Sequence, residues 1–236
     1  MVNACTTPTK VFIQHGVIGI TRGEGLSFTI QNYVRSLNGT IDIFCVSAEK
    51  EATVVEQMGI PREKMQFTGL PRWDNLEQSI NTEILVFLTH SPKKEYEKKI
   101  NDILSTLSQE HLKQYGYTIH VAIHNMMKER IHIPRGGSVI TDNLAQYIQR
   151  SSLLITDNSS VSWDFIYKGN RVIFYKPDQD FWYIRPPYVE ESVATSPEEL
   201  MERIDDAVQS GCLRKTPDFF AHVDRHCCER VYRTVK

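Results

Sequence analysis

Short apolar runs alternate with amphipathic segments along most of the sequence. Runs rich in Val, Ile, Leu and Phe predict buried strands, and apolar residues at three- and four-residue spacing predict helices. Strands are expected at residues 10–14, 41–46, 65–68, 84–88, 117–123, 138–140, 153–156 and 172–175. Helices are expected at residues 28–37 and 48–58, from 91 onward, at 142–149, after 160, from 197 onward and at 217–232. This alternation is typical of an α/β protein with parallel sheets.

The sequence turns polar between residues 75 and 82, and we expect a domain boundary there. Residues 1–78 and 79–236 then form separate domains. In the second domain, Ser91 and Pro92 are a typical start for a helix, whose lysine pairs are expected on a solvated face. A membrane-surface or acidic-polymer role of that face is the alternative.

The most informative stretch is a strand, a turn and a helix around the sequence DNSS at residues 157–160. Such a turn leaves the first amides of the helix unpaired at the carboxyl end of a parallel strand, with two hydroxyls beside them. These groups favour phosphate, so Ser159 and Ser160 are candidate phosphate ligands. The alternative is that Asp157 or Ser159 only caps the helix.

Two histidines follow predicted strands. His15 comes after the strand at 10–14 and precedes Gly16, which permits a tight turn and the close approach of a ligand. His124 comes at the end of the strand at 117–123. Because ligands of open parallel sheets bind at the carboxyl ends of the strands, both histidines are candidate acids or bases. A purely structural role in the turn is the alternative for His15.

A long loop at residues 176–191 is dense in aromatic and charged residues, among them Trp182, Tyr183 and Arg185. Aromatic rings together with an arginine are suited to hold a nucleotide base and a phosphate. The alternative is a packed loop that covers the sheet edge.

Composition excludes several classes of protein. The formal net charge is -2 and no basic face with interleaved aromatics is present, which argues against a nucleic-acid binder. Five scattered cysteines favour reduced thiols in a cytoplasmic protein over a disulfide framework. No run reaches the ~20 apolar residues of a membrane span, so any membrane contact would be peripheral. His222 and His226 have the spacing of a metal pair but lack an acidic partner motif, so no metal site is predicted.

Four segments taken together carry a resemblance to a known family. They are FIQHG at 12–16, TGLPRWD at 68–74, IHVAIHN at 119–125 and LLITDNSSVSWDFIYKGNRVIFY at 153–175. The sequence resembles the CDP-glycerol glycerophosphotransferase family, enzymes similar to teichoic acid polymerases that build or decorate polyol-phosphate and capsule polymers. The resemblance implies a GT-B architecture, with two Rossmann-like domains facing across a cleft, the N-terminal one abbreviated. The C-terminal domain would hold most of the CDP-glycerol.

The resemblance also implies a reaction. A polyol-phosphate would pass from CDP-glycerol or a related CDP-alcohol to a hydroxyl of a cell-surface polymer or glycan, and CMP would leave. His15 matches the family's histidine before glycine, implying a general base toward the acceptor hydroxyl. His124 matches the second histidine, which would face the pyrophosphate. Such an enzyme would be cytoplasmic and peripheral at the inner face of the cell membrane.

The remaining family positions concern the donor. Ser159 and Ser160 match paired serines that would donate to phosphate, and Asp157 and Asp164 match flanking acids that would organise the turn. Arg185 stands near a basic residue of the family's later loop. No firm cofactor is implied, because the sequence shows no compact acidic ligand set and any Mg²⁺ would arrive with the donor pyrophosphate.

This sequence departs from the family pattern at several places, among them the segments around His124 and after Arg185. Asn158 stands where an aromatic residue is usual, and THSP at 89–92 replaces a Pro-Thr-x-Arg pattern, so an expected phosphate-binding arginine is missing. Two other functions therefore stay open. One is a GT-B glycosyltransferase that uses another nucleotide-sugar, and the other is a non-catalytic module that binds nucleotide or polymer.

Overall fold

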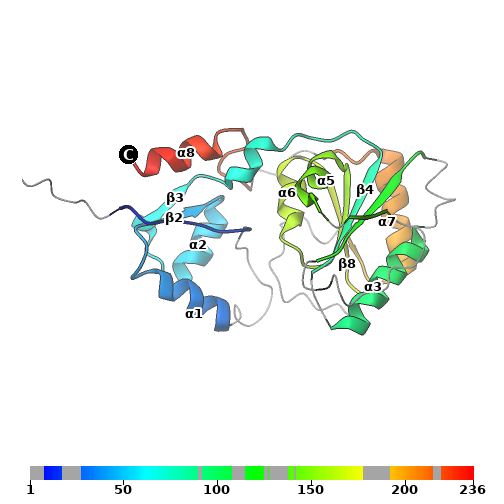
Figure 1. The fold of residues 1–236 in the computed structure, drawn as a ribbon, viewed down its shortest axis with the longest axis horizontal. Coiled ribbons are helices and arrows are strands. Elements are labelled where there is room, and N and C mark those ends of the chain that lie inside the picture. Colours follow the sequence, from blue (N-terminus) through cyan, green and yellow to red (C-terminus); the bar gives the residue numbers. More distant parts are fainter. Residues whose placement is uncertain are drawn as a thin grey trace, which may run out of the picture. The chain divides into compact units, whose positions relative to one another are not determined.

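The chain contains two compact units, each with its own parallel sheet. The computed structural model describes residues 8–17, 28–89, 92–107, 115–124, 127, 138–140, 142–177, 192–214 and 219–236. One unit comprises Met1–Asp74 with Asp218–Lys236, and the other comprises Asn75–Pro217 (Figure 1). The expected class, α/β with parallel sheets, is confirmed.

The N-terminal unit is built on a parallel sheet of order β1-β2-β3. Its elements are β1 (Val11–Ile13), α1 (Phe28–Leu37), β2 (Ile43–Val46), α2 (Glu49–Gln57), the 3-10 helices η1 (Arg62–Lys64) and η2 (Pro71–Asn75), β3 (Met65–Phe67) and α8 (Cys227–Thr234). In Figure 1, α1 and α2 lie on one side of this sheet and α8 on the other. The middle strand β2 is therefore covered on both faces, and Phe44 and Val46 are buried in the core.

Segment 68–74 of this unit packs against residues 219–236, which include helix α8. Trp73 is fully buried, and its ring centroid lies 5.2 Å from that of Phe220. Gly69 has a φ of +71°, and a Cβ at this position would lie 2.8 Å from the Sγ atom of Cys227. Glycine is therefore required here both for the backbone conformation and for the close approach of the helix. In addition, the Thr68 carbonyl accepts a hydrogen bond from Nε of Arg230 at 3.1 Å.

Helix α8 begins later than the sequence pattern predicts. The Asp74 carboxylate accepts hydrogen bonds from the amides of Cys227, at 2.7 Å, and Cys228, at 2.8 Å. The Asp224 carboxylate accepts another from the amide of His226, at 3.0 Å. These bonds fix the first turn of the helix at Cys227, whereas a start near residue 217 was expected. Residues 218–236 thus pack with the N-terminal unit, although the expected boundary near residue 78 would place them in the other domain.

Replacing Asp74 by Asn should destabilise the protein at neutral pH by about 1 kcal/mol, because one of the two amides loses its acceptor oxygen and the negative charge at the helix start is removed. Desolvation opposes ionisation of Asp74, but the hydrogen bonds from Cys228 and Cys227 outweigh it and lower the pKa of the carboxyl below 3.8. The stabilisation is therefore present above pH 3.8 and is lost as the pH falls through the lowered pKa. Urea unfolding should show a difference between parent and variant at pH 7 that shrinks at an acidic pH, as the pH falls through the lowered pKa of the carboxyl. An equal difference at both pH values would contradict this role.

The C-terminal unit is a parallel sheet of order β6-β5-β4-β7-β8-β9 between two layers of helices. Its elements are β4 (Glu83–Phe87), α3 (Lys93–Thr106), β5 (Thr118–Ala122), β6 (Ser138–Ile140), α5 (Leu144–Arg150), β7 (Leu153–Thr156), α6 (Val161–Tyr167), β8 (Arg171–Tyr175), β9 (Val193–Ala194) and α7 (Pro197–Ser210). Helices α3 and α7 cover one face of the sheet, and α5 and α6 cover the other (Figure 1). The short strand β9 was not predicted, since a strand of 2 residues carries no alternating pattern.

The connector between the units is fixed to the C-terminal unit by a buried amide. The Nδ2 group of Asn170 donates to the carbonyls of Ser79, at 2.8 Å, and Ser152, at 3.1 Å. Its Oδ1 atom accepts from the amide of Ser79 at 2.9 Å. Gln78 adds a bond from Nε2 to the carbonyl of Gly169 at 2.7 Å. Within the polar connector predicted at residues 75–82, the amide and carbonyl of Ser79 are thus satisfied beside the start of β8.

Candidate functional site

The C-terminal sheet has a topological switch point between β4 and β7. These parallel strands are neighbours, but the strands next to them, β5 and β8, lie on opposite sides. In such sheets the connections leave the carboxyl edge in opposite directions, and a ligand binds in the crevice between them. The hydroxyl of Thr156, at the end of β7, donates to the carbonyl of Phe87, at the end of β4, at 2.6 Å. The two strand ends are thereby held together at this edge.

Asp157 joins the loops that follow these two strands. Its side chain is only 3% exposed, and its Oδ1 atom accepts hydrogen bonds from the amides of Thr89, at 2.8 Å, and Asn158, at 2.6 Å. Thr89 follows β4 and Asn158 follows β7. One oxygen of the carboxylate thus holds the backbone on both sides of the switch point.

The paired serines form the turn that leads into α6. The Oγ atom of Ser159 accepts from the amide of Val161 at 3.3 Å, and its carbonyl accepts from the amide of Ser162 at 3.1 Å. The carbonyl of Ser160 accepts from the amide of Trp163. The expectation that the first amides of the helix are unpaired is therefore wrong, because this tight turn pairs them with its own oxygens. Within the described residues, three donors of this turn make no hydrogen bond. They are the amides of Ser159 and Ser160 and the hydroxyl of Ser160.

Asp164 lies inside α6 and is buried, at 2% exposure. Its charge acts on Lys168, whose Nζ donates to the carbonyls of Ile148 and Ser151, both at 2.6 Å. Burial lowers the pKa of Lys168 to about 7, while the nearby Asp164 opposes that shift. This pair links α6 to the end of α5.

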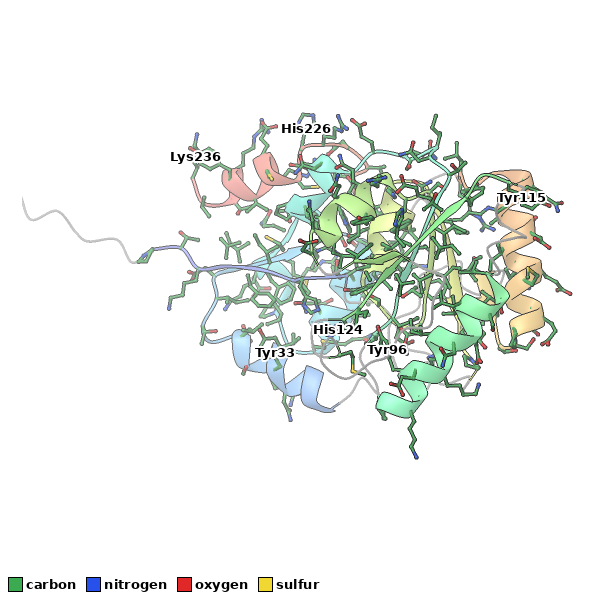
Figure 2. All side chains as sticks on the ribbon, turned by 45° about the vertical axis from the view of Figure 1, so that its right-hand side comes forward. Tyr33, Tyr96, Tyr115, His124, His226 and Lys236 are labelled. Atoms are coloured by element: carbon green, nitrogen blue, oxygen red, sulfur yellow. The ribbon has the colours of Figure 1, made fainter. Side chains whose placement is uncertain are left out.

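His124 lies at the carboxyl end of β5, beside β4. Its ring stacks on Phe87, with the ring centroids 6.2 Å apart and the planes at 22°. Tyr96 of α3 reaches the same place, and Figure 2 shows the two residues side by side. Burial, with a smaller contribution from the Asp157 charge, raises the pKa of Tyr96 to about 12. The phenol therefore stays a neutral hydrogen-bond donor at the site over the physiological pH range.

The other predicted site residues belong to the N-terminal unit or lie outside the described residues. His15 is exposed at the carboxyl end of β1 in the N-terminal unit, and its carbonyl accepts from Nη1 of Arg72 at 2.7 Å. Gly16, directly after it, is buried. Arg185 lies outside the described residues. The structure thus brings His124, Asp157 and the paired serines to one sheet edge and places His15 at the edge of the other sheet.

Two residues at the switch point were not predicted from the sequence. The Oγ atom of Thr89 is buried and, among the described residues, has no hydrogen-bond partner. Lys99 of α3 has a side chain only 4% exposed, and its Nζ lies 4.0 Å from Oδ2 of Asp157. The expected solvated position of Lys99 is therefore wrong. The sequence signal for a buried Lys99 is its spacing of three residues from the apolar position Tyr96, since residues three apart share one face of a helix.

Neither a metal cluster nor a membrane span is found in the described part of the chain. No group of three or more His, Cys, Asp or Glu side chains there could hold a metal ion. His226 instead pairs with Glu229, with Nδ1 and Oε2 3.2 Å apart. No helix among the described residues is long and apolar enough to cross a membrane.

Solved structures show what fold this is. The wall teichoic acid polymerase TagF superposes with a TM-score of 0.67 at 18% identity, over 95% of this chain and 66% of that chain. A TagF variant soaked with CDPG gives a TM-score of 0.62 at 16% identity, over 92% and 63%. A UDP-GlcNAc 2-epimerase from Neisseria meningitidis bound to UDP-GlcNAc gives 0.53 at 12% identity, over 82% and 61%. The fold is therefore GT-B-like.

Sequence comparisons show the family. The minor teichoic acid biosynthesis protein GgaB of Bacillus subtilis (strain 168) is 21% identical, and the match covers 95% of this chain but 29% of GgaB. This chain therefore spans less than a third of that relative, and less than two thirds of the TagF chain described in the structure soaked with CDPG. The model of the CDP-Glycerol:Poly(glycerophosphate) glycerophosphotransferase family matches residues 18–236, and the chain belongs to this family.

Proposed function

We propose that the chain transfers a polyol-phosphate from CDP-glycerol or a related CDP-alcohol to a hydroxyl of a cell-surface polymer or glycan, releasing CMP. Family membership supports the reaction class. The carrying observation is the switch point at β4 and β7. Among the described residues, the amides of Ser159 and Ser160 remain available as donors there, at the same sheet edge as the end of β5 that carries His124. Backbone amides and hydroxyls of this kind match the oxygens of a diphosphate.

In the proposed reaction, an oxygen of the acceptor hydroxyl attacks the β-phosphorus of the donor. The bond from that phosphorus to the CMP oxygen breaks, and CMP leaves with the electron pair. His15 accepts the hydroxyl proton, while Ser159 and Ser160 bind the phosphate oxygens and His124 faces the pyrophosphate. Phosphoryl transfer depends mainly on positioning and on stabilising charge on oxygen, so one base and a set of donors are sufficient equipment.

A second candidate is a reaction on a nucleotide-sugar. The likeness to an epimerase bound to UDP-GlcNAc supports it, because the same type of sheet edge serves both classes of donor. The third candidate, a non-catalytic binding module, is supported by the THSP sequence at 89–92, which lacks the expected arginine.

A transfer assay with a panel of donors distinguishes these functions. The chain is incubated with a poly(glycerol phosphate) acceptor and with CDP-glycerol, UDP-GlcNAc or a GDP-linked sugar, and the released nucleotide is measured. The proposal predicts release of CMP from CDP-glycerol, dependent on acceptor. Turnover of UDP-GlcNAc alone would favour the second candidate, and binding without turnover of any donor would favour the third.

A further inference from the structure

Lys99 is a buried cation that lies close to the buried carboxylate of Asp157. It lies on α3, and its Nζ is 3.1 Å from Oε1 of Glu95 and 4.0 Å from Oδ2 of Asp157. The Glu95 side chain is 45% exposed, so water screens its charge, whereas the Asp157 side chain is 3% exposed. Buried charges require a partner, and each of these two groups supplies one for the other.

The location of Asp157 makes this pairing important for an anionic ligand. Asp157 opens the turn at 157–160, and its own negative charge would repel a phosphate bound to the amides of Ser159 and Ser160. Its Oδ1 atom is occupied by the amides of Thr89 and Asn158, which leaves Oδ2 facing Lys99. A cation on that side reduces the repulsion without occupying the donors of the turn.

We infer that Lys99 is a positioning residue that neutralises Asp157, so that the turn at 157–160 can hold a diphosphate while Asp157 keeps both loops in place. The role of the ligand in this inference rests on the proposed function, whereas the pairing itself does not. Lys99 acts through Asp157 and does not contact the reacting atoms.

A set of variants tests the pairing. Lys99→Met removes the charge and keeps most of the apolar stem, Lys99→Arg keeps the charge, and Asp157→Asn keeps an oxygen for the two backbone amides. The double variant Lys99→Met, Asp157→Asn removes both charges together. Lys98→Met is the matched control on the same helix, because the Lys98 side chain is 68% exposed and pairs with Asp102 at the surface.

Affinity for CDP-glycerol and for inorganic pyrophosphate is measured by calorimetry for each variant. Lys99→Met should weaken binding of both about tenfold, as expected for one charge-assisted interaction, while Lys99→Arg and Lys98→Met should bind like the parent. The double variant should bind more tightly than Lys99→Met, because the repulsive charge has gone. A double variant no tighter than Lys99→Met would overturn the inference, since Lys99 would then act on the ligand directly or only through packing.

Melting temperatures separate this inference from the proposed function. If the parent binds none of these ligands, the proposed function fails. The melting temperatures still test whether Lys99 and Asp157 stabilise each other. The pairing is supported if Lys99→Met melts below the parent and the double variant melts above Lys99→Met, because the unpaired buried charge has been removed. The pairing is overturned if the decrease in melting temperature of the double variant equals the sum of the decreases in Lys99→Met and Asp157→Asn.

Discussion

Replacing His15 by Ala is expected to lower turnover about 10²–10⁴-fold and to leave the affinity for CDP-glycerol unchanged, as for the loss of a general base. The imidazole is exposed at the end of β1, so its removal leaves no cavity. The hydrogen bond from Arg72 is accepted by the main-chain carbonyl of His15, which alanine retains. Removing the imidazole should therefore leave the local fold intact.

His226→Ala is the matched control for this experiment, because it removes an exposed histidine from the same unit. Release of CMP at saturating donor measures turnover, and calorimetry measures donor affinity. A similar loss of turnover and affinity in His15→Ala, or no loss of either, would remove His15 from the role of base.

The double replacement of Ser159 and Ser160 by Ala is expected to weaken the affinity for CDP-glycerol about 10- to 100-fold and to slow turnover as well. Two hydroxyl donors to phosphate would be lost, and a typical hydrogen bond contributes about 0.5–1.5 kcal/mol net. Ser159→Ala also removes the bond from the amide of Val161, so a small loss of stability should accompany the change.

Ser105→Ala is the control for that variant, since among the described residues the Ser105 hydroxyl donates to a carbonyl of its own helix on an exposed surface. Calorimetric titration with CDP-glycerol and thermal melting are run on both proteins. Unchanged donor affinity in the double variant would exclude the serines as phosphate ligands, whatever happens to the rate.

Local patterns predicted most of the fold. Apolar runs and helical spacing identify the strands and helices, because burial of one face imposes a period on the sequence. The helix α7 shows this well: Ser196 accepts from the amide of Glu199 as a capping box predicts, while the Glu199 carboxylate bonds to Thr195. Helix α8 was misplaced because Asp74, which caps it, is 153 residues away in the sequence.

The candidate site was predicted only in part. His124 and Asp157 were each identified at the end of a strand, but their proximity depends on the strand order β5-β4-β7, which no local pattern encodes. Lys99 was expected to be solvated because lysines usually are. Its burial results from the packing of α3 near Asp157, a contact between distant parts of the chain. The roles of His15, His124 and the paired serines stay predictions.

The most direct test of the account is a calorimetric titration of the chain with CDP-glycerol, beside CMP and UDP-GlcNAc. If the switch point at β4 and β7 is a CDP-alcohol site, CDP-glycerol and CMP should bind, and UDP-GlcNAc should bind far more weakly. Equal binding of UDP-GlcNAc, or no binding of either cytidine ligand, would contradict the assignment of this edge as a CDP-alcohol site.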